Sequence, residues 1–320
     1  MSGDWDPHWI GDASHRLYAA LHAVPGTPTT GIVLVPPLLH ELPRTRRFLT
    51  EIASELAKTG LPSLRFDFQG TGDSGGGGEE LDFSTIRRDL DLAIAALREL
   101  TGVSRVCVCA WRGSALALRG WAEQGGAADL LVLWEPIIDG ADWLQRLQES
   151  DARERATRPP ARPGVPRITD RADGQLMGFT ASRALLADLA HSRLDSVRGT
   201  RLPIWLIARA NPGAVPEGVD NVLSLPPGAP AFSTDAAMDA TFFVTPPVRE
   251  LVGQGHTVVS VLHDVSLSLL ADEVVLLRDG EVRYAGPSQS ADARAAIESV
   301  FDHRLRLVRT EEGRWVAVPA

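Results

Sequence analysis

Short apolar runs alternate with amphipathic segments over the first two thirds of the chain. The apolar runs have the length of buried strands, and the amphipathic segments repeat their apolar residues at helical spacing. Strands are predicted at 31–35, 61–68, 104–110, 130–134, 202–208 and 221–225, and helices at 44–59, 83–100 and 113–123. This alternation builds a mostly parallel sheet with helices on both faces, so we expect an α/β fold.

The pattern changes twice further along the chain. Residues 151–167 are charged and proline-rich, which predicts an exposed, mobile loop. The final segment predicts a strand at 257–262, a helix at 264–270, a strand at 273–277 before the turn Asp279-Gly280, a helix at 291–301 and two strands in 304–318. We therefore divide the chain into a larger domain, 1–245, and a C-terminal fragment, 246–320.

The composition is that of an ordinary globular protein, with 44% hydrophobic and 23% charged residues among 320. The net charge of −9 argues against a nucleic-acid partner, because phosphate binding is mostly cationic. No apolar run approaches the roughly 18 residues that a membrane span needs, and the N-terminus does not resemble a secretion signal. We expect a cytoplasmic protein without a membrane span.

Cys107 and Cys109 are the only cysteines of the chain. They stand two positions apart in a predicted strand, so they share a face and are poorly placed to bridge each other. No further ligands accompany them at a spacing typical of a metal site. We expect buried thiols in a reducing compartment, and neither a metal nor a cofactor.

Three motifs in the larger domain resemble those of one enzyme family. They read Val35-Pro-Pro-Leu-Leu-His-Glu41, Asp67-Phe-Gln-Gly-Thr-Gly-Asp-Ser74 and Leu133-Trp-Glu-Pro-Ile-Ile-Asp-Gly140. Together they resemble the α/β hydrolases of the serine aminopeptidase type, and more narrowly the hydrolase associated with the exosortase system of bacterial exopolysaccharide loci. The resemblance covers about residues 15–245. It implies an α/β-hydrolase fold and chemistry on ester or acyl substrates.

The same resemblance implies a nucleophile in a sharp turn after the strand at 104–110. That stretch reads Cys109-Ala-Trp-Arg-Gly113, and Trp111 takes the place of the nucleophile. Indole has no useful nucleophilic atom. Ser114 stands at the start of the next helix, where a hydroxyl typically caps a turn.

The partners of a nucleophile are also replaced. Asn211 stands about where the acid should follow the strand at 202–208, and it cannot stabilise an imidazolium by charge. The loop that should carry the histidine, 226–232, contains none, and His191 and His256 lie elsewhere. We therefore expect a protein whose catalytic positions are substituted.

Polar residues nevertheless gather where α/β folds bind ligands, at the ends of the predicted strands. The candidates are His40, Glu41, Asp67, Gln69, Arg112, Glu135 and Asp139. One interpretation is an acidic pocket containing Arg112, which would hold a small-molecule or acyl ligand. The other is that Asp67 and Ser74 cap a glycine turn and Glu135 pairs with a nearby arginine.

The C-terminal fragment resembles a different family. Arg249–Asp264 and Ala271–Pro287 are similar to the end of an ABC-transporter ATP-binding subunit of the haemin and siderophore importer type. The resemblance implies that His263 corresponds to the histidine that contacts the γ-phosphate of ATP. Lys58 is the only lysine, and no glycine loop precedes it, so we expect no ATP binding and a vestigial His263.

Three functions remain open at this point. The first is a degenerate hydrolase serving as a binding or accessory protein in exopolysaccharide or envelope biosynthesis. The second is a working hydrolase of small acyl or ester substrates that uses His40, Glu41 or Glu135. The third is a component of a transporter assembly. We also expect residues 257–318 to fold and to bury an apolar face against the rest of the chain, a second copy or another protein.

Overall fold

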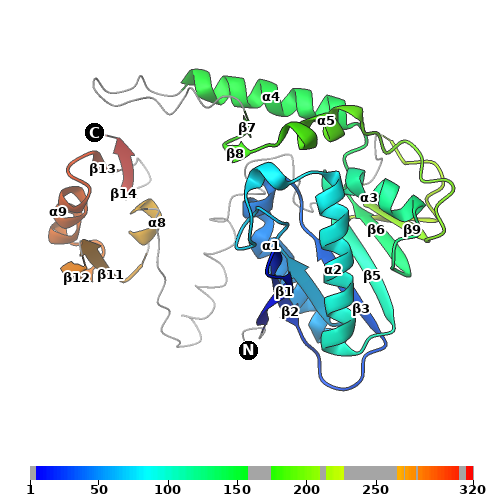
Figure 1. Ribbon diagram of the computed structural model, residues 1–320. Coiled ribbons are helices and arrows are strands. Elements are labelled where there is room, and N and C mark those ends of the chain that lie inside the picture. Colours follow the sequence, from blue (N-terminus) through cyan, green and yellow to red (C-terminus); the bar gives the residue numbers. More distant parts are fainter. Residues whose placement is uncertain are drawn as a thin grey trace. The chain divides into compact units, whose positions relative to one another are not determined.

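The computed structural model describes residues 5–157, 174–209, 214–226, 265–269, 271–278, 280–309 and 315–319. The chain forms two compact units, residues 1–240 and residues 241–320. Each is described below by itself (Figure 1). No helix in the described ranges is long and apolar enough to cross a lipid bilayer.

An eight-stranded sheet organises the first unit, in the order β1-β2-β4-β3-β5-β6-β9-β10. Its strands are β1 (Asp6–Asp12), β2 (His15–His22), β3 (Thr30–Val35), β4 (Ser63–Phe66), β5 (Arg105–Trp111), β6 (Leu130–Trp134), β9 (Ile204–Ala208) and β10 (Asn221–Ser224). β1 pairs antiparallel with β2, β2 pairs antiparallel with β4, and the strands from β4 to β10 in this order are parallel. The expected mostly parallel sheet is confirmed.

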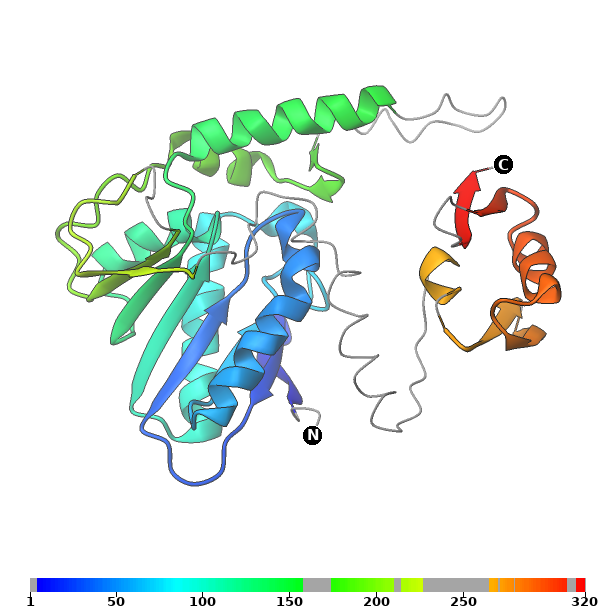
Figure 2. The ribbon, with the colours of Figure 1, turned by 180° about the vertical axis from the view of Figure 1, so that it is seen from behind.

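Helices cover both faces of this sheet (Figures 1 and 2). Helix α1 (Glu41–Lys58) covers one face, where its Leu49 and Ala53 pack with Trp111. Helices α2 (Phe83–Thr101) and α3 (Ser114–Glu123) cover the other face. The apolar stripe of α2 is fully buried there, as its helical spacing predicts.

Helices α4 (Gly140–Thr157) and α5 (Arg183–His191) pack on each other across the end of the sheet where the parallel strands finish. Helix α4 corrects the first part of the loop expected at 151–167, because residues 151–157 are helical, and residues 158–167 lie outside the described residues. Arg155 donates to Asp151 at 2.6 Å, a stabilising pair four residues apart, and the first proline comes only at Pro159. Short elements η1 (Gly78–Glu80), β7 (Gln175–Leu176) and β8 (Phe179–Thr180) complete this unit.

The second unit is a small α/β arrangement. It contains α8 (Val265–Ser268), the antiparallel pair β11 (Glu273–Arg278) and β12 (Glu281–Pro287), α9 (Ala291–Val300), and the antiparallel pair β13 (Leu305–Arg309) and β14 (Trp315–Pro319). Leu269, Ile297 and Leu307 form its buried core. The strand predicted at 257–262 lies outside the described residues.

Candidate functional site

The turn between β5 and α3 holds an arginine in a left-handed conformation. Trp111 ends β5, is fully buried, and stacks on Trp134 with 5.3 Å between ring centroids. Arg112 follows with a φ of +55°, which side chains with a Cβ rarely adopt. Sequence reasoning assigned the nucleophile's position to Trp111, whereas the left-handed residue of the turn is Arg112. Trp111 instead packs in the core beside α1.

The Arg112 guanidinium joins residues from neighbouring strand ends. Its Nε donates to Oε1 of Glu41 at 3.2 Å, and its Nη1 donates to the carbonyl oxygen of Glu135, also at 3.2 Å. Arg209, just after β9, donates from Nε to Oε1 of Glu135 at 2.8 Å. Because Glu41 follows β3 and Glu135 follows β6, the sheet order brings these residues together. We call Glu41, Arg112, Glu135 and Arg209 the elbow cluster.

Burial dominates the electrostatics of the elbow cluster. The Glu41 side chain is only 3% exposed and that of Arg112 is 17% exposed. Burial raises the pKa of Glu41, the Arg112 guanidinium opposes this rise, and the Glu135 carboxylate adds to it. Among the described residues, Oε2 of Glu41 and Oε2 of Glu135 have no hydrogen-bond partner. The cluster therefore keeps two unused acceptors.

Apolar side chains lie directly against this turn. A Cβ built on Gly113 would come within 2.7 Å of the Trp143 ring, which belongs to α4 and is 4% exposed. Leu38 and Leu39 fill the loop after β3, both buried, and Leu39 has a φ of +55°. His40 follows them at the N-cap position of α1. The indole of Trp143 thus packs on the backbone that follows Arg112.

No protein-family model matches the chain. No curated protein matches it either. Among solved structures, the alpha/beta hydrolase GrgF from Penicillium sp. sh18 covers 79% of this chain and 96% of its own, with a TM-score of 0.50 at 13% identity. This chain has the α/β-hydrolase fold.

Two further hydrolase-fold structures are similar at lower scores. The alpha/beta hydrolase domain-containing protein 10 from mouse is 14% identical, over 78% of this chain and 100% of that one, with a TM-score of 0.45. Est1E from Butyrivibrio proteoclasticus, solved with ferulic acid bound, is also 14% identical, over 68% of this chain and 88% of that one, with a TM-score of 0.46. At such identities the likeness extends to the fold alone.

A hydroxyl group and two thiol groups lie close to the turn after β5. The hydroxyl is already hydrogen-bonded, and the thiols are held in their unreactive, protonated form. Ser114 is buried, and its Oγ donates to the carbonyl oxygen of Trp111 at 2.7 Å. Burial raises the pKa of the Cys107 thiol to about 12, and it raises that of Cys109 as well. Thiols with such pKa values stay protonated at neutral pH, and the thiolate is the nucleophilic form.

Asp139 and His191 take structural roles in the hydrolase-fold unit. Asp139 accepts the backbone N–H of Asp142 at 3.0 Å and forms an ion pair with Arg193 at 3.4 Å, so it caps the start of α4. His191 is exposed at the end of α5, where its Nδ1 bonds to the carbonyl oxygen of Ala187 at 2.7 Å. Neither belongs to the elbow cluster.

Three residues singled out from the sequence cannot be placed. Asn211, His256 and His263 lie outside the described residues. The positions assigned to the acid and to the ABC-type histidine are therefore still sequence-based predictions. Among the described parts of the chain, no group of three or more His, Cys, Asp and Glu side chains could hold a metal ion.

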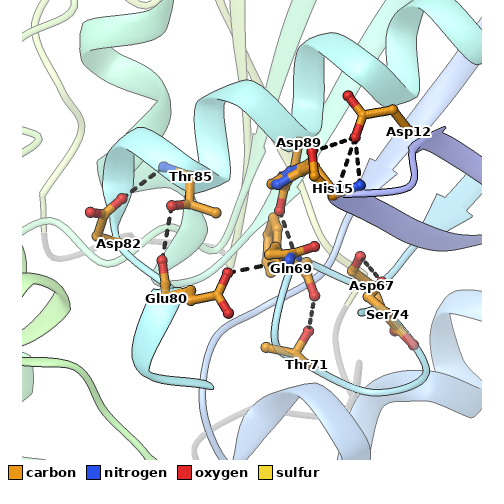
Figure 3. A network of polar contacts seen from close by, with 12 residues as sticks. Asp12, His15, Asp67, Gln69, Thr71, Ser74, Glu80, Asp82, Thr85 and Asp89 are labelled. Carbon is orange, nitrogen blue, oxygen red and sulfur yellow. Dashed lines mark hydrogen bonds and ion pairs between the residues drawn. The ribbon is translucent and has the colours of Figure 1, made fainter. Parts of the chain in front are cut away.

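Gln69 belongs to a second polar network, beside the N-terminal hairpin (Figure 3). Its backbone N–H donates to Oδ2 of Asp89 at 2.8 Å, and its Nε2 donates to Glu80 at 3.3 Å. Oδ1 of Asp89 pairs with His15. Burial raises the pKa of Asp89, and the bonds from Gln69 and His15 oppose that rise. Sequence reasoning missed this pair, although Asp89 visibly interrupts the apolar stripe of α2.

Asp67 is held by contacts of its own, at the start of the glycine turn. Its Oδ2 accepts from Nη2 of Arg46 at 2.6 Å and from the backbone N–H of Asp73 at 3.0 Å. Ser74 donates from Oγ to the Asp67 carbonyl oxygen at 2.6 Å. These are turn-capping contacts. The strand-end candidates therefore separate. Glu41, Arg112 and Glu135 belong to the elbow cluster, Asp67 and Gln69 belong to separate polar networks, and Asp139 and His40 stand at helix starts.

Proposed function

We propose that this hydrolase-fold chain is a noncatalytic binding or accessory protein. The observation that carries the proposal is Arg112, which stands at the left-handed position of the turn where this fold presents its nucleophile. A guanidinium keeps its proton at any physiological pH and has no lone pair for attack on a carbonyl. Its ion pair with buried Glu41 and the packing of Trp143 against Gly113 also support this proposal, because they fill the space around the turn with side chains.

The elbow cluster also favours one kind of ligand. The unused Oε2 atoms of Glu41 and Glu135 are acceptors, so they favour a small molecule that brings hydroxyl or amine donors. An acyl ligand would need such a group near its polar end. The motif resemblance alone leads us to propose that this role belongs to exopolysaccharide or envelope biosynthesis in the cytoplasm.

One observation favours the alternative of a working hydrolase. Burial raises the pKa of Glu41, and a carboxyl group with a raised pKa suits general acid catalysis. In that alternative Glu41 would protonate a leaving group, and water would be the attacking group.

Ester hydrolysis and covalent labelling separate the two proposals. We expect the purified chain to hydrolyse p-nitrophenyl acetate and butyrate no faster than buffer, and to take no label from a fluorophosphonate probe. The variants Glu41→Gln and Ser114→Ala serve as matched controls. Turnover that disappears in Glu41→Gln would support the alternative. Turnover that disappears in Ser114→Ala, with probe labelling, would show a serine nucleophile and contradict the noncatalytic proposal.

We further propose that the C-terminal fragment does not bind ATP, which argues against a role in a transporter assembly. Lys58 lies on α1, where its Nζ pairs with Glu55 at 2.6 Å, and no glycine loop precedes it. Calorimetric titration with Mg-ATP is expected to give no binding heat at micromolar protein concentration. A saturable micromolar affinity that is lost in His263→Ala would contradict this prediction.

A further inference from the structure

A small cavity is lined by residues of α1 and of the strands that α1 covers. Figure 2 shows α1 in front of this face of the sheet. Its volume is about 30 Å³. Strands β2, β3 and β4 line it with mostly apolar side chains, and Tyr18, Arg46, Arg65 and Asp67 supply its polar wall. None of the elbow-cluster residues lines it. The cavity is therefore separate from the site discussed above, and the inference drawn from it does not depend on the proposed function.

The two arginines of this cavity differ in how their charges are balanced. Arg46 pairs with Asp67 at 2.6 Å and with Asp73 at 3.3 Å. Arg65 is half-buried and makes one hydrogen bond among the described residues, from Nε to Nε2 of His22 at 3.2 Å. No carboxylate of the described residues lies within ion-pair distance of Arg65. The guanidinium carbon also lies 6.0 Å from the centroid of the Trp5 ring, and the two Nη groups make no hydrogen bond with the described residues.

The imidazole that accepts from Arg65 does not supply the missing negative charge. Burial and the Arg65 guanidinium lower the pKa of His22 to about 4, so the ring is neutral at pH 7. Burial also lowers the pKa of Arg65, but a guanidinium remains charged. Arg46 forms ion pairs with Asp67 and with the more exposed Asp73. Asp67 also attracts Arg65 at longer range, but among the described residues no carboxylate lies at ion-pair distance from the Arg65 guanidinium.

We propose that this cavity, which we call the Arg65 pocket, binds the carboxylate group of a small monoanion. A carboxylate matches the planar fork of a guanidinium, and a charge-assisted pair of this kind is among the stronger polar contacts. A cavity of about 30 Å³ holds about two water-sized groups, which matches the two oxygens of one carboxylate. The rest of the ligand would extend toward solvent.

Asp67 determines the charge of the ligand. Its carboxylate lines the same cavity as Arg65, so a second negative charge on the ligand would be repelled. Its ion pair with Arg46 leaves Arg65 without a carboxylate in direct contact, and the carboxylate of a ligand would take that place. A monocarboxylate is therefore expected to bind better than the phosphate dianion, although both present oxygens to the guanidinium.

Titration of the full-length chain tests this inference. The Nε–Hε signal of Arg65 is followed by NMR at pH 7.5 while sodium acetate or sodium butyrate replaces sodium chloride at constant ionic strength. We expect a saturable shift with roughly millimolar affinity, and affinity for phosphate weaker by about tenfold. An equal response to chloride and acetate, or tighter binding of phosphate, would overturn the proposal. All of these titrations use the wild-type chain.

Variants then assign the site. Arg65→Gln is expected to weaken acetate binding by about tenfold or more, and Arg65→Lys, which keeps the charge but not the fork, by a smaller factor. The acetate affinity of both variants is measured from the rise in melting temperature with acetate concentration. Arg105→Gln, at an exposed position of β5 outside the pocket, is the matched control and should bind as the wild type does. Binding unchanged in both Arg65 variants would contradict the proposal.

Discussion

Arg112 and Glu41 depend on each other at the turn after β5. Without the guanidinium, the Glu41 carboxylate, 3% exposed, would be buried beside the Glu135 carboxylate. Removing one partner of a buried ion pair costs about 3 kcal/mol or more. We therefore expect Arg112→Met to lower the free energy of unfolding by about 3 kcal/mol, and the double variant with Glu41→Gln to recover most of it.

Urea unfolding of the four proteins of this cycle measures the coupling between the two residues. Arg47→Met is the matched control, because Arg47 pairs with Glu51 on the exposed side of α1. Such exposed pairs contribute less than about 1 kcal/mol. Equal losses in Arg112→Met and Arg47→Met would contradict a special role for the buried pair.

His22 gives the fold a pH dependence that can be isolated. Its pKa is lowered to about 4 in the folded chain, mainly by burial, from an ordinary value of 6.5. Between these values the unfolded chain binds a proton and the folded chain does not, so the stability contributed by His22 falls on acidification through this window. Relative to His22→Gln, the wild type should lose on the order of 2 kcal/mol between pH 7 and pH 4. A stability difference independent of pH would contradict this.

The contact between α3 and α4 can be tested with one methyl group. Gly113 has an ordinary φ of −65°, so alanine is not strained there, but its Cβ would meet the Trp143 ring at 2.7 Å. Overpacking of this kind typically costs about 1–3 kcal/mol. Gly113→Ala should lower the melting temperature, and combining it with Trp143→Leu should cost less than the sum of the two changes. Additive costs would show that the two residues do not touch.

The helices and strands were predictable where one period dominates. The strands β3, β4, β5, β6, β9 and β10 were found from apolar runs, and α1, α2 and α3 from helical spacing, whereas β7 and β8 were not predicted. The hairpin β1–β2 was not predicted, because Leu17, Ala20 and Leu21 repeat at a spacing that also suits a helix. Helix α4 was not predicted, and its last residues were assigned to a loop because their charge and the nearby prolines outweighed the stabilising ion pairs.

The candidate site was harder to predict than the elements that carry it. Glu41, Arg112 and Glu135 were selected because strand ends of a parallel sheet share one edge. The left-handed conformation of Arg112 is a single backbone torsion, which the order of side chains does not reveal, and the assignment of the nucleophile's position to Trp111 stays a prediction. The His15–Asp89 pair joins residues 74 positions apart, and neither stands in a local motif. The Arg65 pocket depends on which partners are missing, which only coordinates show.

At the scale of the whole molecule, the two units should differ in stability. Ile297 is 1% exposed in the small core of the second unit, and replacing a buried isoleucine by alanine costs about 2–5 kcal/mol. Ile297→Ala should raise hydrogen exchange across β11, β12 and α9 while β3 and β5 stay protected. Leu90→Ala, at a fully buried position of α2, should do the reverse. Loss of protection in both units from either change would show that they unfold together.

The left-handed conformation of Arg112 also fixes the direction in which the side chain at position 112 leaves the backbone. Arg112, with a φ of +55°, lies between the end of β5 and the start of α3. Trp111 before it and Ser114 after it are fully buried. A probe introduced by Arg112→Cys would therefore stand beside Glu41, next to the backbone on which Trp143 packs. The Arg112 side chain is 17% exposed, so reagents have limited access to this position. The alkylation rate of that thiol, compared with the rate of a fully exposed cysteine, would measure how strongly the surrounding side chains shield the turn.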